Sequence, residues 1–203
     1  MVWWLDFLFP PRVDEMALRG ISADDFLALI APQLVPATEP GTVALLPFPD
    51  TAVRAAIHEA KYHGSEKAFG FLSAALAEYL RDADDIERRK SRVSIVPVPL
   101  GKERHQERGF NQVEKIIELA NKEFPVTIDV TLLERTRETA SQVSLPRRER
   151  EENMRGAFRA TRRADASHTY IVIDDVITTG ATLQAAIDAL KEAGATHIVP
   201  LAL

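Results

Sequence analysis

The residues best suited to chemistry are two adjacent acids, Asp174 and Asp175, which follow the apolar run Tyr170–Ile173. Such a run is typical of a strand buried on both faces of a parallel sheet. Ligands of α/β proteins bind at the carboxyl ends of such strands. Two neighbouring carboxylates repel each other and resist burial unless a partner satisfies them. The vicinal hydroxyls of a ribose, or a magnesium ion beside them, would do so.

The segment after the acids suits a phosphate group. It is short, rich in hydroxyls and small side chains, and leads directly into a predicted helix, where backbone N–H groups form an anion cradle. No Gly-Lys-Ser/Thr follows, which excludes a Walker A loop. Acids on one side and a phosphate cradle on the other match a sugar phosphate held at both ends. The cradle residues are Val176, Ile177, Thr178, Thr179, Gly180, Ala181 and Thr182.

Secondary-structure patterns on both sides of this segment indicate how it is positioned. Apolar residues at helical spacing predict helices, and short β-rich runs predict strands. Helix N-caps are predicted at Ser22, with the acid Asp25 at the third position, and at Asn111, with Glu114. A strand, a helix and a strand in succession favour a right-handed crossover in a parallel sheet. The expected helices are 53–64, 68–80, one starting at 111, and 182–193, and the expected strands are 43–46, 93–98, 126–132, 170–173 and 197–203.

The segment Tyr170–Thr182 resembles the PRPP-binding motif of the type I phosphoribosyltransferases. The resemblance implies that Asp174 and Asp175 contact the ribose hydroxyls, together with Mg²⁺, and that residues 176–182 hold the 5-phosphate. It also implies the fold of that group, an α/β domain with a central, mainly parallel sheet flanked by helices.

The whole chain is similar to the ComF/GntX family, the competence-protein F-like phosphoribosyltransferases. The resemblance implies binding of PRPP, a link to DNA uptake or nucleotide salvage, and a phosphoribosyltransferase domain over residues 51–203. A small, mostly helical appendage would occupy residues 1–50. The matching segments, in family order, are Leu5–Arg12, Ile57–Gly64, Val96–Leu100 and Glu107–Gln112, then Arg135, Gln142, Arg150, Asn153, Gly156–Phe158 and the PRPP motif.

The N-terminal region departs from the family. Members usually carry a four-cysteine zinc ribbon after the Phe-Pro-Pro-Arg segment, but this chain contains no cysteine. We therefore expect no zinc site, no disulfide and no thiolate chemistry. The histidines show no metal-ligand spacing; His58 and His63 are five apart and are not expected to share a helix face. Trp3, Trp4 and Phe7 are expected to pack on the core.

A polar loop predicted after residue 99 complements the acid pair. The family fold places it beside the anomeric end of the ribose, where pyrophosphate leaves, and its amides and cations would neutralise that group. A solvated basic turn is the alternative, and Glu103 would weaken the positive field if it pointed inward. The candidate pyrophosphate ligands are Leu100, Gly101, Lys102, Arg104 and Arg108, with Arg108 also a candidate catalytic residue.

Charge is distributed unevenly along the chain. The net charge is −5, yet residues 135–163 contain nine arginines and four glutamates. Local basicity in an acidic protein indicates a polyanionic ligand at one place, although a solvated arginine-rich surface explains the charge equally well. Within it, Arg135–Phe158 is the candidate for a mobile hood over the site. Arg147, Arg148 and Arg150 would contact pyrophosphate or an acceptor, or instead pair with neighbouring glutamates.

Taken together, these features predict a magnesium-dependent phosphoribosyltransferase that transfers phosphoribosyl from PRPP to a nitrogen acceptor. The alternative is a non-catalytic PRPP- or nucleotide-sensing module, or a competence factor that binds single-stranded DNA. Against DNA binding stand the net acidity and the lack of aromatic residues beside the arginines. A weaker alternative is a sugar-phosphate hydrolase with Asp174 as its nucleophile, but the segment lacks the Asp-x-Asp arrangement that such a nucleophile and its acid require. We further expect a cytoplasmic location and no membrane association, and the sequence leaves the oligomeric state open, with a homodimer as one candidate.

Overall fold

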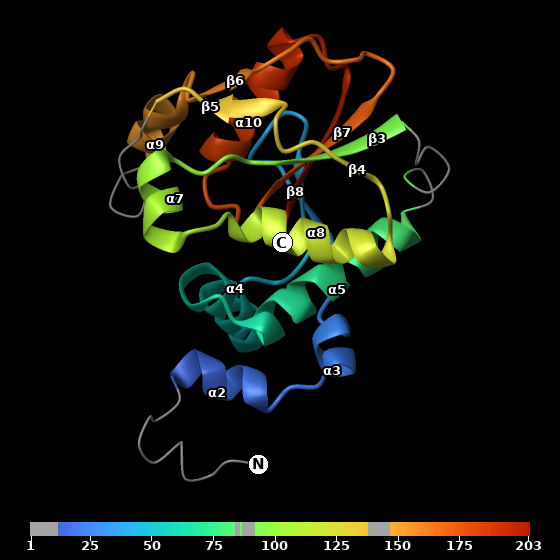
Figure 1. Cartoon of the computed structure of the whole chain (residues 1–203), viewed down its shortest axis with the longest axis vertical. Helices are drawn as coiled ribbons and strands as arrows, with labels where there is room; N and C mark the ends of the chain where they lie inside the picture. Colours follow the sequence, from blue (N-terminus) through green and yellow to red (C-terminus); the bar gives the residue numbers. More distant parts are fainter. Residues whose placement is uncertain (1–11, 84–85, 87–91, 138–146) are drawn as a thin grey trace.

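A six-stranded sheet forms the centre of the computed structural model, which describes residues 12–83, 86, 92–137 and 147–203, without the side chains of residues 147 and 148 (Figure 1). The strand order is β1-β2-β8-β7-β3-β4. The β2–β8, β8–β7, β7–β3 and β3–β4 pairs are parallel, and β1 is antiparallel to β2 at one edge. The strands are β1 (Gln33–Val35), β2 (Thr42–Ala44), β3 (Val93–Pro97), β4 (Thr127–Ile128), β7 (Thr169–Asp174) and β8 (His197–Ala202).

Helices cover the two faces of this sheet, as expected for the predicted α/β fold (Figure 1). Alternate residues of β7 point to opposite faces, so that Ile171 joins the apolar core under α4, α5 and α8, and Val172 joins the core under α10. Both side chains are fully buried, which is why the run contains no polar residue. The helices are α2 (Val13–Arg19), α3 (Ala23–Leu27), α4 (Thr51–His63), α5 (Glu66–Asp82), α7 (Lys102–Arg108), α8 (Gln112–Glu123), α9 (Arg147–Met154) and α10 (Ala181–Glu192).

A second sheet of two antiparallel strands, β5 (Leu133–Arg135) and β6 (Phe158–Ala160), lies against α10. The predicted strand 126–132 was therefore wrong in extent, because β4 ends at Ile128 and the chain then leaves the main sheet for the small one. Arg135 is paired with Phe158, so the two ends of the segment expected to form a hood meet side by side.

The predicted helix boundaries follow from capping residues. Ser22 Oγ accepts a hydrogen bond from the backbone N–H of Asp25 at the start of α3, and Asn111 Oδ1 accepts one from Val113 at the start of α8. The predicted N-cap at Asn111 is thus confirmed, and Asn111 Nδ2 also donates to Glu114 Oε1 at 2.9 Å. These caps satisfy N–H groups that would otherwise lack partners at the helix N-termini.

The expected division of the chain at residue 50 stays a prediction. Helices α2 and α3 lie at the end of the molecule away from the small sheet (Figure 1), and Leu18 and Phe26 belong to the same core as α4 and α5. Strand β2, however, also precedes residue 50 and is hydrogen-bonded to β8 in the main sheet. The tryptophans Trp3 and Trp4, together with Phe7, lie outside the described residues. Within the described ranges, the structure contains no helix long and apolar enough to cross a membrane.

A buried carboxylate joins the N-terminal helices to the rest of the molecule. Glu59 of α4 is 1% exposed, and its two oxygens accept hydrogen bonds from Arg12 Nε and Nη2 at 2.9 and 2.7 Å. The Arg12 guanidinium, through these hydrogen bonds and its charge, lowers the pKa of Glu59 despite the opposing effect of burial. Arg12 immediately precedes α2, so the ion pair fastens α2 to α4.

We expect Arg12→Ala to lower the melting temperature at neutral pH by about 2–6 °C, because it leaves a buried carboxylate without its partner. The lowered pKa means that this stabilisation is present above the unfolded-state pKa of Glu59, about 4.3. The stabilisation is lost as the pH falls through the pKa of Glu59 in the folded protein, which is the lower of the two pKa values. Calorimetric melts across the acid range would check both points. Arg19→Ala is the matched control, since its ion pair with Glu15 is half-exposed. An equal effect of both substitutions would contradict the role of burial.

Candidate functional site

The two acids lie at the carboxyl end of β7, in the middle of the parallel strands. Asp174 is the last residue of the strand and is paired with Ala202 of β8, and Asp175 follows it. Asp174 Oδ1 accepts a hydrogen bond from the backbone N–H of Asp175 at 2.8 Å. The Asp175 side chain points elsewhere: its Oδ2 accepts hydrogen bonds from Lys61 Nζ and Gln112 Nε2, both at 2.7 Å. The acids therefore have different surroundings despite being adjacent.

Asp174 is the acid with the perturbed ionisation. Burial, reinforced by the nearby charge of Asp175, raises the pKa of Asp174 to about 7, although Lys61 and Arg104 oppose the shift. Part of the residue still reaches solvent, but its carboxyl is closely surrounded by protein. A carboxylate in this position is stabilised by any cation or hydrogen-bond donor that approaches it.

The loop after the acids encloses a small pocket and leads into α10. The helix begins at Ala181, with Gly180 as its N-cap residue. Thr179 Oγ1 accepts a hydrogen bond from Ala181 N at 3.4 Å. Of the predicted cradle, all but Thr179 line the pocket, together with Asp174. The lining residues are Asp174, Val176, Ile177, Thr178, Gly180, Ala181, Thr182 and Leu183.

Gly180 is the residue on which the shape of this loop depends. Its φ is +79°, in the left-handed region that favours glycine. The β1–β2 connection also crosses it so closely that a Cβ atom would lie 2.5 Å from the carbonyl oxygen of Ala37. The connection is held there by hydrogen bonds to α10, from Glu39 N to Gln184 Oε1 and from Lys191 Nζ to Glu39 O.

The segment predicted to be a polar loop after β3 is in fact the short helix α7. Its bounds are marked by Gly101 at the N-cap and Gly109, with φ +75°, at the C-cap. All of its residues are exposed or half-buried, which explains why apolar periodicity did not predict it. Leu100 and Gly101 precede the helix, whereas Lys102, Arg104 and Arg108 lie on it.

The pyrophosphate candidates on α7 differ in their surroundings. Arg104 lies close enough to the acids to lower the pKa of Asp174 by its charge. Arg108 instead donates to Gln112 Oε1 at 3.1 Å and lies over the Tyr62 ring, with 5.3 Å between the guanidinium carbon and the ring centroid. Lys102 and Glu103 are exposed, so Glu103 is on the solvent side of the helix.

Comparison with known proteins finds a domain match and several relatives. Residues 111–202, which include α8, the acids, the loop and α10, match the phosphoribosyl transferase domain family. The chain is 36% identical to the DNA utilization protein YhgH of Escherichia coli over 51% of this chain and 45% of that protein. It is 29% identical to competence protein F of Haemophilus influenzae, over 59% and 53% of the two chains. For competence protein ComFC of Streptococcus pneumoniae the identity is 34%, over 54% and 46%.

The domain match and these relatives together support a ComF-family, phosphoribosyltransferase-like protein. It spans about half the length of the curated relatives that it matches. The family resemblance expected from the motifs is thus confirmed, as is the α/β fold. The roles of individual residues stay predictions.

Two residues that contact the acids were not among the predicted site residues. Lys61 and Gln112 both reach Asp175, although 114 and 63 residues separate them from it in the sequence. Each belongs to a segment that resembles the family, Ile57–Gly64 or Glu107–Gln112, so the sequence did contain a signal. Only the fold shows that the two segments meet at one carboxylate.

The predicted hood residues lie on or near α9. Arg147 and Arg148 are in its first turn, but their side chains lie outside the described residues, and Arg150 is half-buried. Met154 of the same helix is buried in the core against α10. Helix α9 is therefore anchored at its C-terminal end, and the contact of its arginines with a ligand stays a prediction.

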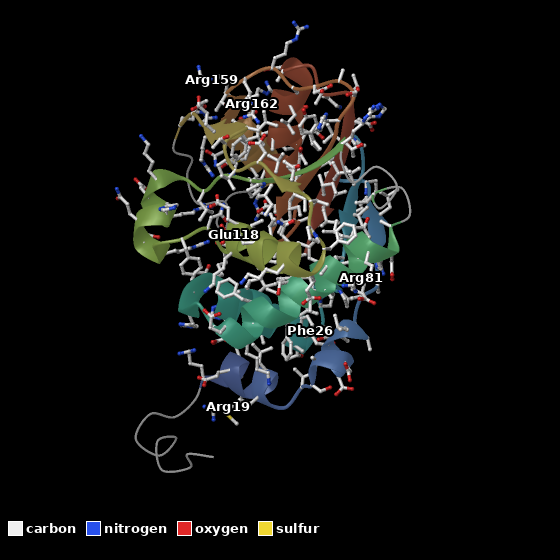
Figure 2. All side chains as sticks on the ribbon, turned by 45° about the vertical axis from the view of Figure 1, so that its right-hand side comes forward. Arg19, Phe26, Arg81, Glu118, Arg159 and Arg162 are labelled. Atoms are coloured by element: carbon white, nitrogen blue, oxygen red, sulfur yellow. The ribbon has the colours of Figure 1, made fainter. Side chains whose placement is uncertain are left out.

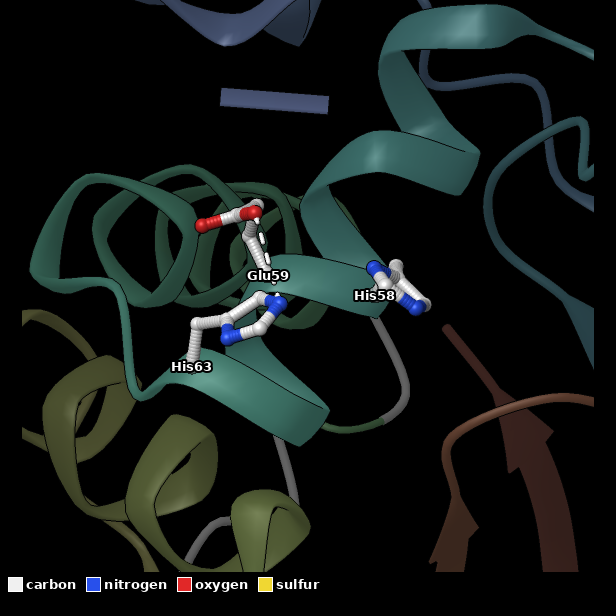
Figure 3. Close-up of side chains that lie close together, drawn as sticks. All are labelled: His58, Glu59 and His63. Carbon is white, nitrogen blue, oxygen red and sulfur yellow. Dashed lines mark ion pairs between the residues drawn. The ribbon is translucent and has the colours of Figure 1, made fainter. Parts of the chain in front are cut away.

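His58, Glu59 and His63 form a cluster on α4 (Figure 3). The expectation that His58 and His63 do not share a side of the helix was wrong, because their ring centroids are 5.7 Å apart. One potential ligand atom from each of the three residues lies within 4.8 Å of the others. Both oxygens of Glu59, however, already accept from Arg12, and His58 Nδ1 lies 2.9 Å from Asp14 Oδ2. The cluster is accounted for by these ion pairs, and the expected absence of zinc stays a prediction.

Proposed function

We propose that this ComF-family protein binds PRPP at Asp174–Thr182 and transfers its phosphoribosyl group to a nitrogen acceptor. The observation that supports this most directly is the position of the two acids at the end of β7, beside a glycine-containing loop that opens α10. The ribose hydroxyls would lie against the acids. The 5-phosphate would be held by backbone N–H groups and threonine hydroxyls of residues 176–182.

The proposed reaction is a displacement at C1 of the ribose. A bond forms between the acceptor nitrogen and C1, the bond from C1 to the pyrophosphate oxygen breaks, and its electron pair leaves with pyrophosphate. The acceptor nitrogen releases its proton to solvent. The transition state has the character of an oxocarbenium ion, so that the protein would act mainly by holding both ends of PRPP and neutralising the leaving group.

Magnesium is the cofactor that the site would accept. Mg²⁺ prefers carboxylate oxygens and substrate phosphates as ligands, and the raised pKa of Asp174 marks a carboxyl that a nearby cation would stabilise in its ionised form. Asp174 and Asp175 would hold the ion together with PRPP. Bound there, Mg²⁺ would neutralise part of the charge of the diphosphate.

The leaving pyrophosphate would meet the N-terminal end of α7. Leu100 and Gly101 would offer backbone N–H groups, and Lys102 and Arg104 would offer cations. The effect of Arg104 on the Asp174 pKa supports this assignment, because it places the guanidinium charge within reach of the acid pair. The arginines of α9 are proposed to complete the site from the side of the small sheet.

Calorimetric titration with PRPP, with and without Mg²⁺, tests the proposed function. The wild type is expected to bind PRPP in a magnesium-dependent manner. Asp174→Asn/Asp175→Asn should bind about 100-fold more weakly or not at all while keeping the wild-type circular dichroism spectrum. Release of pyrophosphate in the presence of a panel of nucleobases then tests transfer. If the double variant bound PRPP as tightly as the wild type, the proposed site would be wrong.

A second candidate function is binding of single-stranded DNA, with or without PRPP turnover. The names of two relatives, a DNA utilization protein and a competence protein, favour it. So does a pocket of about 440 Å³ between β6 and the C-terminal part of α10, which is lined by Arg159, Arg162 and Arg163. Arg159 and Arg162 lie close together at the end of the molecule opposite Arg19 (Figure 2).

Two ion pairs limit the charge that this basic surface can offer. Arg159 is paired with Glu134, and Arg162 with Asp129. Fluorescence anisotropy of a labelled oligo-dT, recorded over a range of salt concentrations, separates the two functions. Binding that weakens steeply with salt and is lost in Arg159→Ala/Arg163→Ala would support DNA binding. Binding that is insensitive to this substitution would exclude this surface.

A further inference from the structure

Two donors from distant parts of the chain converge on one oxygen of Asp175. Lys61 is in the last turn of α4 and Gln112 is the first residue of α8. Both donate to Oδ2 at 2.7 Å. Gln112 is 3% exposed, and the side chains of Lys61 and Asp175 are 24% and 12% exposed. The contact is therefore a largely buried one, where hydrogen bonds and charges have greater effect than at the surface.

The orientation of the Gln112 amide is set by its second partner. Its Oε1 accepts from Arg108 Nη1 at 3.1 Å. Since an arginine can only donate, the amide oxygen must face Arg108 and the amide nitrogen must face Asp175. The guanidinium of Arg108 is in turn placed over the Tyr62 ring. Asp175 thus receives one charged donor, Lys61, and one neutral donor, Gln112, and the latter is held by Arg108.

The two carboxylate oxygens of Asp175 therefore differ in the number of hydrogen bonds that they accept. A carboxylate oxygen accepts about two hydrogen bonds. Oδ2 already accepts two, whereas Oδ1 accepts none from the side chains that the structure describes, so Oδ1 is the oxygen available to a ligand. We propose that Lys61 and Gln112 are positioning residues that present Asp175 to the ribose of PRPP through Oδ1 alone. This inference rests on the proposed function.

A purely structural ion pair is the competing explanation, and the packing of α4 argues against it. The helix is docked by buried apolar residues, among them Val53, Ala56 and Ala60, and by the pair that Arg12 forms with Glu59, two residues before Lys61. Lys61 lies near the end of the helix and lines a pocket of about 370 Å³ with Tyr62, Glu107 and Arg108. Since the other contacts already dock α4, the Lys61–Asp175 pair at the end of the helix is available to orient the carboxylate.

The test compares Lys61→Met, Lys61→Arg and Gln112→Leu with the wild type by calorimetric titration with PRPP and Mg²⁺. Lys61→Met keeps the length and the apolar packing of the side chain but removes its charge. We expect it to bind PRPP about 10–100-fold more weakly, the usual effect of removing a residue that orients a ligand-binding group. Lys61→Arg should bind more tightly than Lys61→Met because it keeps a cation. Gln112→Leu should also weaken binding.

Lys122→Met, which removes a lysine charge from an exposed position of α8, is the control and should bind PRPP as the wild type does. The second readout is the crystal structure of Lys61→Met without ligand, in which the Asp175 carboxylate should turn from its wild-type orientation while the backbone of β7 stays in place.

Wild-type affinity of Lys61→Met for PRPP, or an unchanged Asp175 side chain in its structure, would overturn the inference. If the wild type itself bound no PRPP, the proposed function would fail. The orientation of Asp175 in the two structures would still decide whether Lys61 positions it.

Discussion

Replacing Asp174 with asparagine should abolish magnesium-dependent binding of PRPP and at the same time stabilise the protein at alkaline pH. The variant loses the negative charge proposed to meet the ribose and the metal ion. It also loses a carboxylate whose ionisation the fold opposes, since burial and Asp175 raise the pKa of Asp174 to about 7. Asparagine keeps an oxygen that can accept from the backbone N–H of Asp175.

The sign of the stability effect follows from proton binding. Between the unfolded-state pKa, about 3.9, and about 7, the folded protein keeps a proton on Asp174 that the unfolded chain has released. The free energy of unfolding therefore falls as the pH rises through this range and is lowest above it. Asparagine does not titrate, so the variant does not undergo this fall in the free energy of unfolding. We expect Asp174→Asn to be more stable than the wild type by about 1–3 kcal/mol at about pH 8, with little difference at about pH 4.

Urea denaturation at the two pH values measures this effect. Asp188→Asn is the matched control, because Asp188 is an exposed aspartate on α10, and its substitution should produce no comparable gain. If Asp174→Asn were destabilising at alkaline pH, the carboxyl would be stabilised in its ionised form by the fold, contrary to the raised pKa. A gain in stability together with lost PRPP binding would show that the acid is retained for ligand binding.

Gly180→Ala should have the largest effect of any single methyl addition in the PRPP loop. The new Cβ atom would lie 2.5 Å from the carbonyl oxygen of Ala37, so either the loop or the β1–β2 connection must move. The left-handed φ of +79° adds backbone strain. We expect a loss of about 2–4 kcal/mol in the free energy of unfolding from the two effects together. PRPP affinity should fall by about 100-fold, since the cradle atoms shift.

Gly156→Ala separates these two causes. Gly156 has a similar φ of +66°, but an added Cβ would meet no atom within 4 Å in the described part of the structure. Its substitution should cost only the backbone strain, about 1–2 kcal/mol. Denaturation curves of the two variants would give the difference that belongs to the contact with Ala37. Equal losses would mean that the β1–β2 connection gives way without cost and does not hold the loop.

Local patterns in the sequence determined most of the elements around the candidate site. The apolar run Tyr170–Ile173 corresponds to β7, because a strand buried on both faces excludes polar residues. The caps at Ser22 and Asn111 depend on side chains and backbone within three residues, which is why they were predictable. The same holds for the loop of residues 176–182 and the start of α10. Helix α7 was missed because it has no apolar face that a sequence pattern could show.

Contacts between distant segments were decided by the tertiary structure alone. The closeness of Ala37 to Gly180, the convergence of Lys61 and Gln112 on Asp175, and the meeting of Arg135 with Phe158 all join residues far apart in the chain. Nothing in the local sequence of one segment specifies its partner, because that depends on strand order and helix packing. The sequence thus indicated which residues are candidates to bind a ribose phosphate, whereas the fold decided which distant side chains contact them.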